Sequence, residues 1–80
     1  MTKDKGNLDS MILDLASDLE PLVSEIESGT KTTKGNYGRY MGLLSALANN
    51  KESAQIMALA MIKAGANKQG VSDGLKIAFP

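Results

Sequence analysis

Residues 8–28 read LDSMILDLASDLEPLVSEIES, and their hydrophobic spacing decides the fold. Apolar side chains recur at alternating intervals of four and three residues, which is the period of one face of an α-helix. The stripe consists of Leu8, Ile12, Leu15, Leu19, Leu22 and Ile26. We therefore predict a helix over about 8–28 with one apolar face and an opposite face of acidic and serine residues.

The same stripe fits a heptad with Ile at position a and Leu at position d, the pairing favoured in parallel two-stranded coiled coils. Pro21 falls at position c, on the solvent side, so we expect one kinked helix rather than two short ones. Three heptads fit a homotypic seam and packing against the chain's own helices about equally well. The six stripe residues are therefore candidate contacts of an oligomer interface.

Residues 29–36 (GTKTTKGN) are polar and predict a loop, and Asn36 is placed to cap a second helix over about 37–49. Gly38 and Gly42 lie on one face of that helix, although each glycine costs about 1 kcal/mol relative to alanine. Small residues four apart let another backbone approach closely; the alternative is a glycine face that meets water. We include both glycines among the candidate interface residues.

The third predicted helix spans about 51–64, and Asn49 with Glu52 resembles a capping box at its start. Almost every side chain along it is apolar, and a helix that is apolar all round requires burial all round. An 80-residue chain has little other protein to surround it. This pattern favours a homodimer.

The segment 65–74 (GANKQGVSDG) is rich in turn residues, and Ser72 or Asp73 can cap a short last helix over about 72–79. The sequence therefore predicts an all-α protein, a small helical bundle of three main helices plus this short one. We expect a single domain over 7–80, preceded by a disordered segment over 1–6.

The composition excludes several classes of function. The chain has no Cys and no His, which removes thiol nucleophiles, Ser-His-Asp triads and the usual ligands of transition metals. We therefore expect a non-enzymatic protein with no cofactor and no metal site. Apolar runs are far shorter than the ~20 residues that cross a bilayer, and we expect no secretory signal. Cytoplasmic residence follows as the expectation.

The formal net charge is zero, but the charges are divided along the chain. Residues 1–30 carry two Lys and seven acids, a net of −5, whereas residues 31–80 carry seven bases and two acids, a net of +5. Such asymmetry fits three arrangements. The halves neutralise each other within the fold, they do so across a dimer, or the acidic helix binds a basic protein partner.

An alternative function rests on a basic and aromatic segment. Lys and Arg side chains can contact phosphates while Tyr rings stack on bases. The candidate nucleic-acid contacts are Lys31, Lys34, Tyr37, Arg39 and Tyr40. Tyr37 and Tyr40 also lie on the apolar arc of the second helix, where they would face the core instead.

The stretches GNYGRYMGLLSAL and MIKAGANKQGVSDGLKIAF, within residues 35–79, resemble small uncharacterised proteins of tailed phages that infect cyanobacteria. These stretches contain no catalytic motif. The resemblance implies a viral accessory protein, present in the host cytoplasm, of unknown process. Our leading interpretation is a self-associating interaction or regulatory protein.

Overall fold

The structure, a computed structural model, describes residues 3–29 and 33–80, and these residues form four α-helices, one short 3-10 helix and no strand. The elements are α1 (Lys3–Ser28), η1 (Thr33–Asn36), α2 (Tyr37–Leu47), α3 (Lys51–Lys63) and α4 (Lys68–Ala78). The predicted all-α bundle is confirmed. Among the described helices, none is long and apolar enough to span a membrane.

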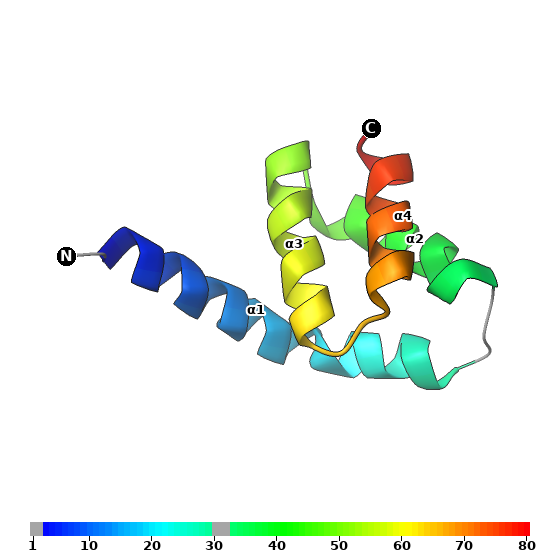
Figure 1. Ribbon diagram of the computed structural model, residues 1–80, viewed down its shortest axis with the longest axis horizontal. Helices are drawn as coiled ribbons and strands as arrows, with labels where there is room; N and C mark the ends of the chain where they lie inside the picture. The colour runs from blue at the N-terminus through cyan, green and yellow to red at the C-terminus, as the bar shows by residue number, and fades with distance from the viewer. Residues whose placement is uncertain (1–2, 30–32) are drawn as a thin grey trace.

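The helix α1 lies along one side of the molecule, and α3 and α4 stand across it (Figure 1). It packs chiefly against α3, whereas α2 packs chiefly against α4. The N-terminal end of α1 projects beyond α3 (Figure 1). A helix of 26 residues is about 39 Å long at 1.5 Å per residue, which accounts for most of the 44 Å long axis.

As expected, α1 is a single helix that continues through Pro21. Proline removes one backbone donor, and this loss is tolerated on an exposed face. The helix begins at Lys3, five residues before the predicted start, so it includes most of the segment 1–6 that we expected to be disordered. Residues 1–2 lie outside the described residues. At the other end, the Ser28 hydroxyl donates a hydrogen bond to the Ser24 carbonyl oxygen at 2.6 Å.

The caps of α3 and α4 differ from those predicted. Asn50, not Asn49, caps α3, and its side-chain oxygen accepts from the Ser53 amide at 2.8 Å. Asn67 caps α4, accepting from the Gly70 amide at 2.9 Å, so this helix begins four residues before the predicted start. Each Asn places its oxygen over an amide three residues later, as an N-cap does.

Two glycines inside α4 explain why its first turns resemble a loop in the sequence. A Cβ on Gly70 would lie 1.8 Å from the carbonyl oxygen of Gly35. A Cβ on Gly74 would lie 2.7 Å from the amide nitrogen of Met41 and 2.9 Å from the carbonyl oxygen of Tyr37. The two glycines therefore allow α4 to approach η1 and α2 at backbone distance, and they do not end the helix.

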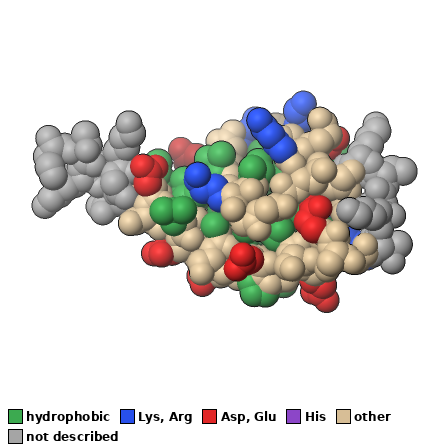
Figure 2. All heavy atoms as spheres, turned by 60° about the horizontal axis from the view of Figure 1, so that its bottom comes forward, with side chains coloured by type: hydrophobic (Ala, Val, Ile, Leu, Met, Phe, Trp, Pro, Cys, Tyr) green, Lys and Arg blue, Asp and Glu red, His purple; other side chains and the backbone are tan. Residues whose placement is uncertain are grey.

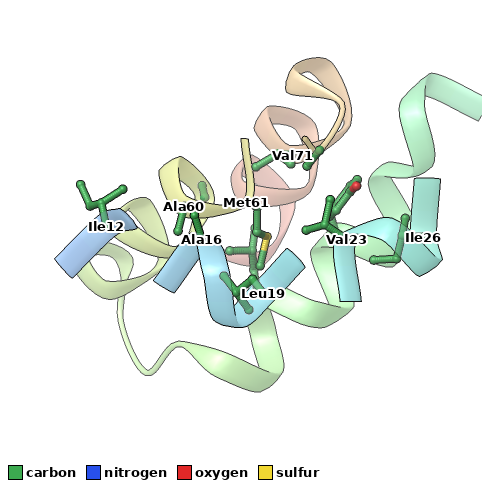
Figure 3. Close-up of a cluster of buried hydrophobic side chains, with 12 residues drawn as sticks. Ile12, Ala16, Leu19, Val23, Ile26, Ala60, Met61 and Val71 are labelled. Carbon is green, nitrogen blue, oxygen red and sulfur yellow. The ribbon is translucent and has the colours of Figure 1, made fainter. Parts of the chain in front are cut away.

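The hydrophobic core lies between α1 and the other three helices (Figure 3). Residues of α1 contribute one face, α3 contributes Ala60 and Met61, and α4 contributes Val71. Tyr40 and Leu44 close the core from α2, and both are fully buried. Because α1 supplies one face to three helices, its orientation determines which of its side chains remain at the surface.

Candidate interaction surface

The structure divides the predicted stripe of α1 between the core and the surface. The position-a residues Ile12, Leu19 and Ile26 are buried in the chain's own core. The position-d residues behave differently, since Leu8 is 44% exposed and Leu22 is 41% exposed. The parallel a/d seam is therefore not available for a second chain, because half of it already packs inside the protein.

The reason for this division lies in two smaller residues at position e. Ala16 and Val23 are buried together with the position-a residues, so the face that contacts the core is a/e rather than a/d. A helix can turn either flank of its a positions toward a core. Ala16 is small, which allows α3 to lie close to this side of α1.

The opposite flank of α1 remains open. We call it the open flank; it runs at alternating steps of three and four residues, which places its members on one side of the helix. Met11 on this flank is 43% exposed, and Leu15 is partly buried. The open flank consists of Leu8, Met11, Leu15, Asp18, Leu22 and Glu25.

A groove of about 390 Å³ lies where the C-terminal half of the open flank faces α2. Its sides carry leucine from both helices, together with one acid and one base. It is lined by Leu22, Glu25, Ile26, Gly38, Arg39, Gly42, Leu43 and Ala46. Four of the eight predicted interface residues therefore meet here, and Leu43 and Arg39 of α2 join them.

The glycines of α2 form an open part of this groove. A Cβ built on Gly38 or Gly42 would meet no atom within 4 Å, so neither glycine mediates a close contact inside the molecule. That role belongs to Gly70 and Gly74 in α4. The small face of α2 is therefore free for a contact from outside.

Exposed hydrophobic side chains also occur away from the groove. Leu13 of α1 is 58% exposed, Leu59 of α3 is 51% exposed, and Ile77 of α4 is 53% exposed. Leu59 shows that α3, which we expected to be buried nearly all round, is partly open within the described chain. Single exposed hydrophobic residues are common. In the groove, Leu22 is exposed, Leu43 of the adjoining helix is partly buried, and Ile26 is buried.

The acidic side chains of α1 are spread over the face that α1 presents, with hydrophobic side chains between them (Figure 2). Five of the six acids with described side chains are exposed. The sixth, Glu27, is partly buried, and it accepts a hydrogen bond from the Tyr40 hydroxyl and another, at 2.8 Å, from the Asn67 amide. Neither donor is a base, so these contacts do not neutralise the acidic helix within the fold.

Tyr40 is fully buried, and its environment keeps the phenol neutral. Burial first, then the hydrogen bond to Glu27 and the negative charge of that carboxylate, raise the pKa of Tyr40 well above its ordinary value. A protonated phenol is the form that donates a hydrogen bond. Tyr40 is therefore a structural residue that faces the core, as its place on the apolar arc allowed.

Of the other predicted nucleic-acid contacts, the two with described side chains, Tyr37 and Arg39, line different depressions. Tyr37 is partly buried and lines a depression with Asp73, Lys76 and Ile77. Arg39 is exposed and lines the groove with α1 instead. Lys34 belongs to η1, and Lys31 lies outside the described residues. With Tyr40 buried, the predicted basic-aromatic cluster lacks one of its two rings.

Among the described residues, no group of three or more acids is placed to hold a metal ion. Comparison of the chain with protein-family models, with curated proteins and with solved structures gives no match. The chemistry of the groove and the open flank therefore carries the functional interpretation.

Proposed function

We propose that this protein is a non-enzymatic, cytoplasmic interaction protein that self-associates as a homodimer through the open flank of α1 and the groove beside it. The observation that carries the proposal is the position of Leu22. This side chain is 41% exposed at the junction between the flank and the groove, which it lines together with Leu43 and the open glycines of α2.

The mixed charge of the groove supports a second copy as the partner. Glu25 and Arg39 line the same groove, so the surface carries one acid and one base. An isologous interface is built from the same surface of each copy, so a surface that carries both signs can face a second copy without a repulsion of like charges throughout. A surface of one sign would favour a partner of the other sign instead.

The resemblance of residues 35–79 to small proteins of cyanobacterial tailed phages extends this proposal to an accessory role in a phage. A small self-associating module without Cys or His fits such a role.

The test measures molecular mass by light scattering with sedimentation at tens of micromolar. We expect a dimer for the wild type and a monomer for Leu22→Asp, because a charge in an apolar contact is costly to desolvate. Leu13→Asp is the matched control, since Leu13 is more exposed, at 58%, and lies on the other side of the same helix. This control should remain a dimer.

Two results would overturn the proposal. A wild-type monomer at these concentrations removes self-association. A dimer that survives Leu22→Asp but dissociates with Leu13→Asp places the contact on the other side of α1.

A further inference from the structure

We infer that the groove between α1 and α2 is filled by the N-terminal end of α1 from a second copy, so that the two α1 helices run antiparallel and cross at Leu15. This inference rests on the proposed self-association, and it names the segment that occupies the groove. It also replaces the parallel seam that the heptad pattern alone favours.

The three leucines of the open flank are spaced symmetrically about Leu15. Leu8 lies seven residues before it and Leu22 lies seven residues after it, on the same line of the helix. A two-fold axis through Leu15 therefore brings Leu8 of each copy opposite Leu22 of the other, and the two Leu15 side chains opposite each other. Leu8 and Leu22 are similarly exposed, at 44% and 41%, as two surfaces that cover one another would be.

The two ends of α1 complement each other in shape. The N-terminal end projects beyond α3, where it has no helix beside it (Figure 1). The C-terminal half carries the groove, whose floor at Gly38 and Gly42 is open to an incoming chain. An antiparallel pair places each projecting end beside the other copy's groove. A parallel pair would place the two grooves against each other, and no helix would then cover Gly38 and Gly42 of either copy.

The charges of the open flank favour the same direction. Asp18 and Glu25 lie on the flank on either side of Leu22, and both are exposed. In a parallel pair each acid would face the same acid of the other chain, and like charges that face each other destabilise an interface. In the antiparallel pair the two Glu25 side chains lie 20 residues apart along the axis, about 30 Å at 1.5 Å per residue, and the two Asp18 side chains lie six residues apart, about 9 Å. Both separations exceed the Debye length of about 8 Å at physiological ionic strength, the second only slightly.

The groove also offers an acid to the incoming segment. Residues 1–8, which would arrive there, carry two Lys and one Asp, a net of +1, although residues 1–30 together carry −5. Of the two charges that line the groove, Glu25 rather than Arg39 is the one that this end complements.

Cysteine cross-linking tests the inference directly, because the chain contains no Cys and single substitutions have no background. A disulfide requires Cα atoms about 4.4–6.8 Å apart. We expect Leu15→Cys to form a covalent dimer under mild oxidation. We expect Leu8→Cys and Leu22→Cys each to fail alone, because the two equivalent cysteines of the dimer would lie about 21 Å apart along the helix axis.

A mixture completes the test. When ¹⁵N-labelled Leu22→Cys is mixed with unlabelled Leu8→Cys, mass spectrometry should find the mixed disulfide as the main covalent dimer. Leu13→Cys, on the other side of α1, is the matched control and should cross-link no more than wild type. Circular dichroism melts verify that every variant folds like the wild type.

The remaining outcomes separate the two proposals. Self-cross-linking at all three positions would show a parallel pair, which overturns this inference and leaves self-association intact. A dimer by light scattering with no cross-link at these positions would place the interface elsewhere and overturn the inference. A wild-type monomer by light scattering would overturn the proposed function itself.

Discussion

The buried hydroxyl of Tyr40 donates a hydrogen bond to the carboxylate of Glu27, and this contact joins α2 to the last turns of α1. The same carboxylate oxygen accepts from the amide of Asn67, at the start of α4. Glu27 therefore links α1, to which it belongs, with α2 and the start of α4 at one point. It differs from the other acids of α1 with described side chains, which are exposed.

Removing the Tyr40 hydroxyl should destabilise the fold. Tyr40→Phe keeps the ring but leaves the partly buried Glu27 with the Asn67 amide alone, and we expect the free energy of unfolding to fall by about 1–3 kcal/mol. Urea denaturation followed by circular dichroism measures this change. Tyr37→Phe is the matched control, because Tyr37 is only partly buried, and it should stay within about 0.5 kcal/mol of wild type. Equal losses in the two variants would mean that the contact with Glu27 contributes nothing.

The raised pKa of Tyr40 predicts a loss of stability at high pH. Below a pH of about 10, tyrosine is protonated in both the folded and the unfolded chain, so the contribution is fully present. Above it, the unfolded chain loses the proton while folded Tyr40 retains it, and the free energy of unfolding falls by up to about 1.4 kcal/mol per pH unit. Lysines also titrate in this range, so the relevant quantity is the difference in slope between wild type and Tyr40→Phe.

Ultraviolet absorbance of tyrosinate measures the same shift. The chain has two tyrosines, so Tyr37→Phe retains Tyr40 as its single chromophore. We expect folded Tyr37→Phe to show almost no tyrosinate at a pH of about 10, where a free tyrosine is half ionised. The same variant in denaturant should show the ordinary titration. A half-ionised folded sample at this pH would contradict the assigned environment of Tyr40.

The glycines of α2 and α4 should respond in opposite ways to alanine. Gly74→Ala places a methyl group 2.7 Å from the Met41 amide nitrogen, and overpacking of this kind costs about 1–3 kcal/mol. Gly42→Ala meets open space inside a helix, and it should stabilise the chain by up to about 1 kcal/mol. Urea denaturation at a protein concentration too low for self-association compares the two. A destabilising Gly42→Ala would show that this side of α2 already packs closely in the single chain.

The sequence was sufficient to predict the helices but not which neighbours they contact. The hydrophobic period predicts α1 as one helix that continues through Pro21, because this period depends only on the spacing of residues close together in the chain. The same period could not decide which flank of Ile12 and Leu19 meets the core. That choice depends on how closely α3 can lie beside Ala16, which is a property of the assembled fold.

The glycines illustrate the same limit. In the sequence, Gly70 belongs to a turn-rich segment just before the predicted last helix, whereas Gly38 and Gly42 indicate either a contact face or a face that meets water. A glycine indicates either a turn or a close approach, and only the position of the neighbouring backbone distinguishes the two. The groove was accessible to sequence reasoning in part, since Leu22 and both α2 glycines were candidates. The contribution of Leu43 and Arg39 to the groove could not be predicted, because it depends on the relative positions of α1 and α2.

Two aspartate substitutions, three residues apart on α1, should separate the core from the surface. Leu19 is 6% exposed, so Leu19→Asp buries an unpaired charge and should cost several kcal/mol, enough to unfold a domain of this size. Leu22→Asp leaves its charge in water within a single chain and should change the stability of that chain by about 0.5 kcal/mol or less. Circular dichroism at low protein concentration measures helix content and the thermal midpoint of both variants. If Leu19→Asp remained folded while Leu22→Asp unfolded, α1 would present its position-d residues rather than its position-a residues to the core, and the open flank would not exist.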